Sequence, residues 1–240
     1  MSTELVSERH LATTTLTLNR PEKANALNAA VVEALLDAFE TAARDGTRLL
    51  VLKGNGRNFC AGFDFGGLED ASEGDLLLRF VRMETLLQAV YHAPFATLAL
   101  AHGKNFGAGV DLILACGTRI GTTDSAFRMP GLKFGLQLGT RRLAARLGGD
   151  AARALLATSR TFSGEEAAKI GFLHRLAQID DWPGLITAAG DDAGQLSPAA
   201  AARLFAATVT ESRAADMADL VASAAEPGVK ERIREYRKGG

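Results

Sequence analysis

The sequence predicts an α/β fold in which helices are layered on a mainly parallel sheet. Two short and continuously apolar runs, residues 49–52 and 96–101, have the length and composition of buried strands. Segments with apolar residues at helical spacing alternate with these runs, and such alternation is typical of parallel pairing. With 240 residues, of which 47% are hydrophobic, the chain can bury a sizeable core in one domain.

The charge and cysteine content exclude several classes of protein. The 27 Lys and Arg residues nearly balance the 28 Asp and Glu residues, which argues against a broad surface for nucleic acid or anionic membrane. Two cysteines cannot form a disulfide framework, and residues 1–11 lack the basic flank and apolar run of a signal peptide. No window approaches the roughly 18 consecutive apolar residues of a membrane span. We therefore expect a cytoplasmic protein.

The first third of the chain predicts a strand, a loop, a helix and a second strand. Residues 10–18 are rich in β-branched side chains, and the loop that follows leads into a helix that Gly46 ends. The strand at residues 49–52 is followed by Gly54 and Gly56, as in a dinucleotide-binding turn. However, Phe59 stands where that fingerprint needs its third glycine, so the nucleotide interpretation is weak.

The middle of the chain contains two glycine-bearing loops. Residues 59–65 form an apolar loop with one glycine and one carboxylate, followed by a helix over residues 76–91. The strand at residues 96–101 leads through a glycine-rich loop into another helix, and short strands are expected at residues 118–121 and 126–129.

The last hundred residues are predicted to be mainly helical. Asp150 is expected to cap one helix, Ser163 with Glu166 to form a capping box, and Ser197 to cap a helix whose first residue is proline. Pro227 is expected to open the last helix. The apolar stripes of the helices after residue 199 are narrow, which indicates packing against a neighbouring subunit.

The loop within residues 101–115 is the strongest candidate for chemistry. A glycine loop between a buried strand and a helix leaves N–H groups unpaired at the helix N-terminus, where the macrodipole favours negative charge. Asp111 lies three residues after Ala108, so its side chain lies on nearly the same helix face. A carboxylate beside an anion-binding turn indicates proton transfer, although Asp111 could instead only stabilise the helix dipole.

Other polar residues are assigned structural roles. His102 follows a buried strand and is expected to be a hydrogen-bonded core histidine, and Cys60 a small apolar filler. Asp64 is expected to hold its loop through backbone hydrogen bonds. Glu84 and Asp124 stay open as a second acid, because the sequence gives no distances.

Five stretches, in this order, resemble the enoyl-CoA hydratase/isomerase (crotonase) family. The resemblance covers nearly the whole chain and implies the crotonase-type fold of repeated ββα units. The stretches are residues 18–28, like a coenzyme A loop; 59–64 and 103–111, like two oxyanion loops; 164–171; and the closing helix at 227–238. The resemblance further implies an acyl-CoA-binding core over residues 1–190. Residues 191–240 would then be a helical region that packs on the core or on a neighbour in a homotrimer or dimer of trimers.

The resemblance also implies the roles of individual residues. The N–H groups of Phe63 and Ala108 would hold the thioester oxygen, where an enolate carries its charge, and Asp111 would act as acid and base. Coenzyme A would enter as part of the substrate, with no metal and no covalently bound cofactor. The residues expected to line its site are Lys23, Ala24, Ala61, Gly62, Asp64, Phe65 and Gly107.

The chain departs from the family pattern at the second catalytic glutamate. Gly131 aligns with that residue, and hydration normally needs two carboxylates. A dienoyl-CoA isomerase branch uses an aspartate at the position of Asp111, but has a carboxylate where this chain has Lys133. We therefore expect isomerisation or slow hydration of an enoyl-CoA. The alternatives are an acyl-CoA binder with little catalysis and a serine hydrolase on a similar fold, for which no Gly-x-Ser-x-Gly is present.

Overall fold

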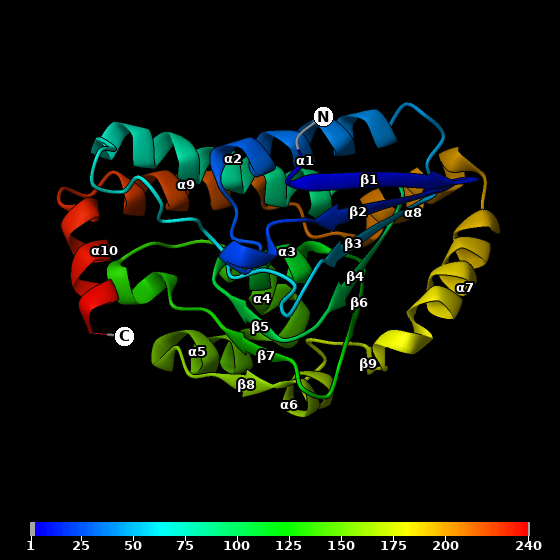
Figure 1. Cartoon of the computed structure of the whole chain (residues 1–240). Coiled ribbons are helices and arrows are strands. Elements are labelled where there is room, and N and C mark those ends of the chain that lie inside the picture. Colours follow the sequence, from blue (N-terminus) through cyan, green and yellow to red (C-terminus); the bar gives the residue numbers. More distant parts are fainter. Residues whose placement is uncertain (1–2, 240) are drawn as a thin grey trace.

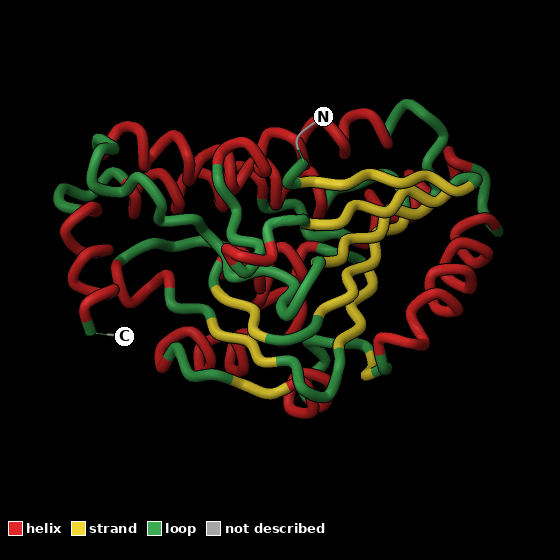
Figure 2. The backbone as a smooth tube through the Cα atoms, in the orientation of Figure 1, coloured by secondary structure: helices red, strands yellow, loops and turns green. Residues whose placement is uncertain are grey.

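The larger of two β-sheets lies at the centre of the fold. The computed structural model describes residues 3–239, and Figures 1 and 2 show the strands of this sheet fanning side by side. Their spatial order is β1 (Leu5–His10), β2 (Thr13–Leu18), β3 (Leu49–Gly54), β4 (Ala96–Ala101), β6 (Thr118–Gly121) and β9 (Arg175–Leu176). Within the described part of this sheet only the β1–β2 pair is antiparallel, so the predicted mainly parallel α/β fold is confirmed.

Side-chain alternation along the strands divides the core between the two faces of this sheet. Leu50 and Leu52 of β3 belong to the main core, which contains residues of α1 (Ala29–Ala42), α2 (Glu73–Tyr91) and α3 (Ala108–Ala115). Leu49 and Val51 face the other way, toward Trp182 at the start of α7 (Trp182–Gly194). Both faces of these strands are buried, which explains why their sequences are continuously apolar instead of alternating.

A smaller sheet lies below the first in Figure 1. It consists of β5 (Lys104–Phe106), β7 (Ala126–Arg128) and β8 (Phe162–Ser163), in that order. The sequence did not predict β5, because its three residues lie inside the glycine-rich loop and carry no alternating pattern. The pairing of β5 with β7 fixes the second loop against the body of the molecule.

Of the remaining helices, α9 (Arg213–Ala224) and α10 (Val229–Lys238) lie at the end of the molecule opposite α7 (Figure 1). The 3-10 helices η1 (Pro21–Lys23), η2 (Gly131–Phe134) and η3 (Ile179–Asp181) are short connections. The α-helices are α4 (Thr140–Leu147), α5 (Gly149–Thr158), α6 (Gly164–Lys169), α8 (Pro198–Thr208), α9 (Arg213–Ala224) and α10 (Val229–Lys238). Buried residues of α2, η2, α9 and α10 form one apolar cluster. By contrast, α8 buries only Ala201 and leaves Leu204 46% exposed.

The strand expected over residues 10–18 is wrong in one respect, since that stretch spans a hairpin. His10 ends β1, Leu11 and Ala12 make the turn, and β2 begins at Thr13. Leu11 has a φ of 53°, in the left-handed region that glycine or asparagine usually occupies. The turn therefore had no residue signal to reveal it.

The helix caps were predicted with mixed success. Ser197 accepts a hydrogen bond from the Ala200 N–H, which confirms its N-cap role. Ser163 accepts likewise from the Glu166 N–H, but the Glu166 carboxylate pairs with Arg160, so the reciprocal half of the capping box is wrong. Asp150 is not a cap, because α5 already begins at Gly149.

Candidate active site

Two loops meet at the carboxyl ends of β3 and β4. The Phe106 N–H donates to the carbonyl oxygen of Cys60 at 3.2 Å. A Cβ at Gly62 would lie 2.3 Å from the carbonyl oxygen of Phe106, and one at Gly109 would lie 2.3 Å from that of Cys60. Both positions therefore require glycine, and the two contacts bring together residues that are 44 and 49 positions apart in sequence.

The N–H groups of Phe63 in the first loop and Ala108 in the second are unpaired within residues 3–239. Phe63 forms a parallel bridge with Leu27, in which the Gly62 carbonyl and the Asp64 N–H bond to Leu27. The N–H of Phe63 consequently points away from Leu27. Ala108 is the first residue of α3, where an N–H has no partner within the helix. Across residues 3–239 neither group has a hydrogen-bond partner.

Both residues line a cavity of about 330 Å³. Its wall is mainly apolar and comes from segments far apart in sequence. It includes Phe63 and Phe65 of the first loop, Phe80 of α2, Phe134 of η2, Leu156 of α5 and Tyr236 of α10. Ring centroids of Phe63 and Phe80 lie 4.6 Å apart, and those of Phe134 and Tyr236 lie 5.3 Å apart. The aromatic contacts thus tie α2, η2 and α10 around one space.

Asp111 is the only acidic residue among the described residues that line this cavity. Its side chain projects from the first turn of α3 and is 3% exposed. Its Oδ1 atom is buried without a hydrogen-bond partner. The pKa of Asp111 is raised to about 8, chiefly by burial; the charge of Arg142 opposes this shift and that of Glu84 adds to it. The carboxyl group is therefore mainly protonated at neutral pH.

Gly139 leaves the space that the Asp111 carboxyl group occupies. A Cβ at Gly139 would lie 1.8 Å from Asp111 Oδ1, and Gly139 also has a φ of +66°. The role of Gly139 was not predicted from the sequence. The fit of these two residues is a matter of tertiary packing.

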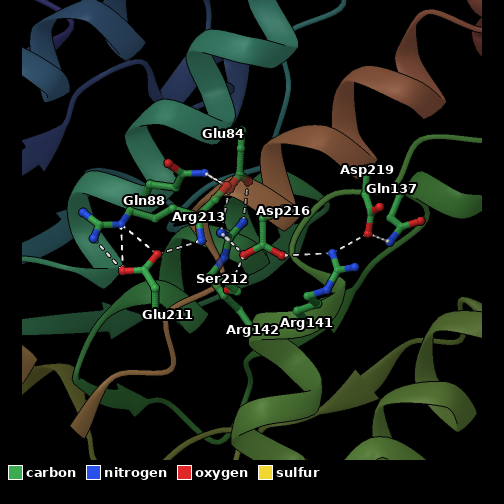
Figure 3. Close-up of polar contacts among 10 residues, drawn as sticks. All are labelled: Glu84, Gln88, Gln137, Arg141, Arg142, Glu211, Ser212, Arg213, Asp216 and Asp219. Atoms are coloured by element: carbon green, nitrogen blue, oxygen red, sulfur yellow. Dashed lines mark hydrogen bonds and ion pairs between the residues drawn. The ribbon is translucent and has the colours of Figure 1, made fainter. Parts of the chain in front are cut away.

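Two residues whose charges affect the pKa of Asp111, Arg142 and Glu84, belong to a buried ion-pair network, which Figure 3 shows. Arg142 of α4 donates to both carboxylate oxygens of Glu84 on α2, at 2.8 and 2.5 Å, and to Asp216 on α9 at 3.2 Å. The side chains of Arg142 and Glu84 are each 1% exposed. Asp216 also lies 3.6 Å from Arg141, so two guanidinium groups share this carboxylate, while Glu84 pairs with Arg142.

Among residues 3–239, no carboxylate other than that of Asp111 lines the cavity. Glu84 is committed to Arg142, and Asp124 is exposed and does not line the cavity. Gly131 does line it, but a Cβ there would lie 2.9 Å from the carbonyl oxygen of Leu136. The Leu136 N–H donates to the Gly131 carbonyl, so the chain folds tightly back at this point. A larger residue at position 131 would have to shift that backbone.

The residues expected around coenzyme A are only partly gathered at the cavity. Ala61, Phe65 and Gly107 line it, together with the expected catalytic residues Phe63, Ala108 and Asp111. Gly62 lies at the contact between the loops rather than in the wall.

Three further members of that set hold or flank the first loop. The Ala24 carbonyl accepts from the Ala61 N–H at 2.9 Å, and Lys23 is exposed on η1 beside it. Asp64 accepts from the Gly66 N–H, as expected, and also pairs with Arg20 at 2.9 Å.

His102 and Cys60 have the structural positions expected of them. His102 is 5% exposed, and its Nε2 is 2.9 Å from the carbonyl oxygen of Gly56. Burial raises the pKa of the Cys60 thiol to about 12, so this thiol stays protonated and unreactive. Two further cavity residues, Arg128 and Arg237, were not predicted, because only the tertiary structure brings β7 and α10 to the site.

Comparison with known proteins agrees with this architecture. The family model for enoyl-CoA hydratase/isomerase matches residues 8–223. A Mycobacterium leprae protein named probable enoyl-CoA hydratase echA6 is 34% identical over 174 residues, covering 70% of this chain and 68% of that protein. A Rhodobacter capsulatus protein named probable enoyl-CoA hydratase is 38% identical over 163 residues, covering 66% of this chain and 62% of its own length.

Solved structures agree as well. A Bordetella parapertussis structure described as an enoyl-CoA hydratase/isomerase has a TM-score of 0.97 and 53% identity, and the match covers 98% of this chain and 99% of that one. An enoyl-CoA hydratase of Bacillus halodurans has a TM-score of 0.85 at 20% identity, over 97% and 99% of the chains, and shows the shared fold. The chain therefore belongs to the enoyl-CoA hydratase/isomerase family and is an enzyme of the crotonase type.

Proposed function

We propose that the protein isomerises an enoyl-CoA through a thioester enolate, with Asp111 moving the proton. The Asp111 carboxylate would remove a proton from C2 of a 3-enoyl thioester, and the electron pair would move onto the thioester oxygen. The N–H groups of Phe63 and Ala108 would stabilise that oxygen. Asp111 would then return the proton to C4, leaving a 2-enoyl thioester and a regenerated carboxylate.

One observation carries this proposal: within residues 3–239, Phe63 and Ala108, whose N–H groups are unpaired, line the same cavity as a single carboxyl group. Isomerisation needs one group that takes a proton and gives it back. Hydration needs one group to activate water and another to protonate C2, and these roles usually fall to two carboxylates. We therefore expect hydration to be slow compared with isomerisation.

The test compares the two reactions in the same preparation. Hex-3-enoyl-CoA isomerisation and crotonyl-CoA hydration are measured for the wild type, for Asp111→Asn and for the control Asp124→Asn, whose carboxylate is exposed outside the cavity. We expect Asp111→Asn to lose a factor of about 10² to 10⁴ in isomerisation, in the range of general acid–base catalysis. Asp124→Asn is expected to keep wild-type rates. Equal isomerisation by the wild type and Asp111→Asn would refute the assignment of Asp111.

A second candidate function is binding of acyl-CoA with little turnover. It is favoured by the pKa of about 8 of Asp111, because a mainly protonated group is a poor base at pH 7. Deuterium exchange at C2 of a bound saturated acyl-CoA separates the two functions. Exchange that Asp111→Asn abolishes supports the enzyme, whereas tight binding without exchange at pH 7 and pH 9 supports the binder. A serine hydrolase has less support, since no serine is among the described residues that line the cavity.

We also propose that the coenzyme A moiety lies over η1 and the first loop. The bond from the Ala61 N–H to the Ala24 carbonyl places η1 next to the cavity wall, and the exposed Lys23 ammonium is available to a phosphate. Lys23→Ala is expected to weaken binding of free coenzyme A several-fold, with a loss that shrinks at high salt. Unchanged affinity at low salt would contradict this placement.

For the assembly, we propose a homotrimer or a dimer of trimers. Support comes from α8, where Leu204 is 46% exposed, and from nearby Leu196, which is 41% exposed. Both line a second cavity, about 540 Å³, beside the sheet face that α7 covers. Light scattering of the purified protein tests the proposal, since a monomer mass at micromolar concentration would exclude it.

A further inference from the structure

Arg128 and Arg237 are the cationic side chains among the described residues that line the cavity; Arg128 is half-buried, whereas Arg237 is exposed. Arg128 ends β7 and pairs in register with Phe106 of β5, and both residues line the cavity. The preceding residue, Phe127, is fully buried in the main core. Because side chains alternate along a strand, the Arg128 side chain leaves β7 on the face opposite to Phe127.

The Arg128 guanidinium has no counter-ion in the part of the chain that the structure describes. Its Nε donates to the Ser159 carbonyl at 2.9 Å, and no carboxylate within residues 3–239 lies within 4.0 Å of it. Ser159 follows the last residue of α5, so this bond fixes the base of the guanidinium at a helix C-terminus. The two terminal nitrogens, with four N–H bonds between them, make no hydrogen bond to the described residues.

A half-buried, unpaired guanidinium is costly in an apolar wall unless an anion shares the space. Arginine also differs from a point charge, because its planar fork matches the two oxygens of a carboxylate. The Asp111 carboxyl group, in the same wall, does not repel an incoming anion at neutral pH because its pKa is about 8.

We propose that Arg128 binds a carboxylate on the acyl group, so that the preferred substrates are CoA thioesters of dicarboxylic acids. This inference rests on the proposed function, since it assumes that the thioester lies in the same cavity. The acyl chain would run from the N–H groups of Phe63 and Ala108 past Asp111, with its far carboxylate on Arg128. The cavity volume of about 330 Å³ suits a short chain.

The test uses two thioesters that differ only at the far end of a five-carbon acyl group. Dissociation constants are measured by calorimetry for glutaconyl-CoA, pent-2-enoyl-CoA and free coenzyme A. We expect the wild type to bind glutaconyl-CoA at least tenfold more tightly than pent-2-enoyl-CoA. Arg128→Met should remove that preference without changing the affinity for pent-2-enoyl-CoA or free coenzyme A, and Arg128→Lys should keep part of it.

A matched control is Arg153→Met on α5, whose side chain is 78% exposed and pairs with Asp150. This variant should keep the full preference. Thermal unfolding of each variant confirms that the altered chain is folded before binding is measured.

Three outcomes would overturn the inference. Equal wild-type affinity for the two thioesters would refute it while leaving the proposed enzyme function intact. An equal loss of affinity for all three ligands in Arg128→Met would instead assign Arg128 to a phosphate of coenzyme A. Failure of the wild type to bind any thioester would refute the proposed function as well.

Discussion

Replacing Asp111 by asparagine should stabilise the protein at alkaline pH while it removes catalysis. Burial raises the Asp111 pKa from its ordinary value of 3.8 to about 8, so the folded state holds this proton more tightly than the unfolded chain does. The stabilisation that the protonated carboxyl group provides is complete below pH 3.8 and is lost progressively as the pH rises through 8. Asparagine has nearly the same shape and never ionises.

The size of the effect follows from the two pKa values. Between pH 5 and pH 8, the wild type should lose on the order of 3 to 4 kcal/mol of unfolding free energy that Asp111→Asn does not lose. The difference in unfolding free energy between the variant and the wild type should therefore grow by about that amount. Urea unfolding at pH 5, 6, 7 and 8 measures it, with Asp124→Asn as the control for an exposed carboxylate.

A constant difference between the variant and the wild type across this pH range would refute the reasoning. It would mean that Asp111 ionises in the folded state as easily as in the unfolded chain. The same pKa also predicts the activity profile. If Asp111 acts as the base, isomerisation kcat/KM should rise about tenfold for each pH unit below 8 and level off above it.

Three further predictions concern the residues around Asp111. Ala108→Pro removes one N–H group at the first helical position, where proline is tolerated, and should lower kcat by a factor of about 10² to 10³ with little loss of helix. A folded variant with the wild-type kcat would exclude that N–H group from the mechanism. Gly139→Ala places a Cβ 1.8 Å from Asp111 Oδ1 in a left-handed backbone, so the unfolding free energy should fall by at least about 1 to 2 kcal/mol and kcat should fall with it. Unchanged values for both would show that the backbone at Gly139 shifts to accommodate the methyl group. Arg142→Met leaves Glu84 buried without its partner and should lower the unfolding free energy, measured with urea, by about 3 to 5 kcal/mol. Adding Glu84→Gln should recover part of that loss, whereas no loss in Arg142→Met alone would show that the pair does not stabilise the fold.

The sequence by itself determined the elements whose signal is local. The run at residues 96–101 is β4, the glycine loop after it opens α3, and Asp111 falls in the first turn of that helix. These features follow from continuous hydrophobicity, glycine content and spacing, which depend on neighbouring residues only. The alternation of strands and helices predicted the mainly parallel sheet, and the family resemblance carried by five stretches added the crotonase-type fold and the joint role of the two loops.

Local sequence signals did not predict elements whose residue types are unusual for the backbone conformation they adopt. The turn at Leu11 has neither glycine nor asparagine, and β5 is hidden in a loop. Glu84 shows the same limit for a side chain. From the sequence, Glu84 was a possible second acid. In the structure, Arg142, which is 58 residues away in sequence, donates hydrogen bonds to both of its carboxylate oxygens.

Only the tertiary structure decided the character of the cavity. Three features of the cavity depend on segments that folding brings together. They are the burial of Asp111 Oδ1, the space that Gly139 leaves for it and the position of Arg128 in the wall. A carboxyl group has its ordinary pKa in the unfolded chain, and burial among neighbours shifts it. The sequence could therefore supply the aspartate, while the packing of α3, α4 and β7 around one space determined what the aspartate can do.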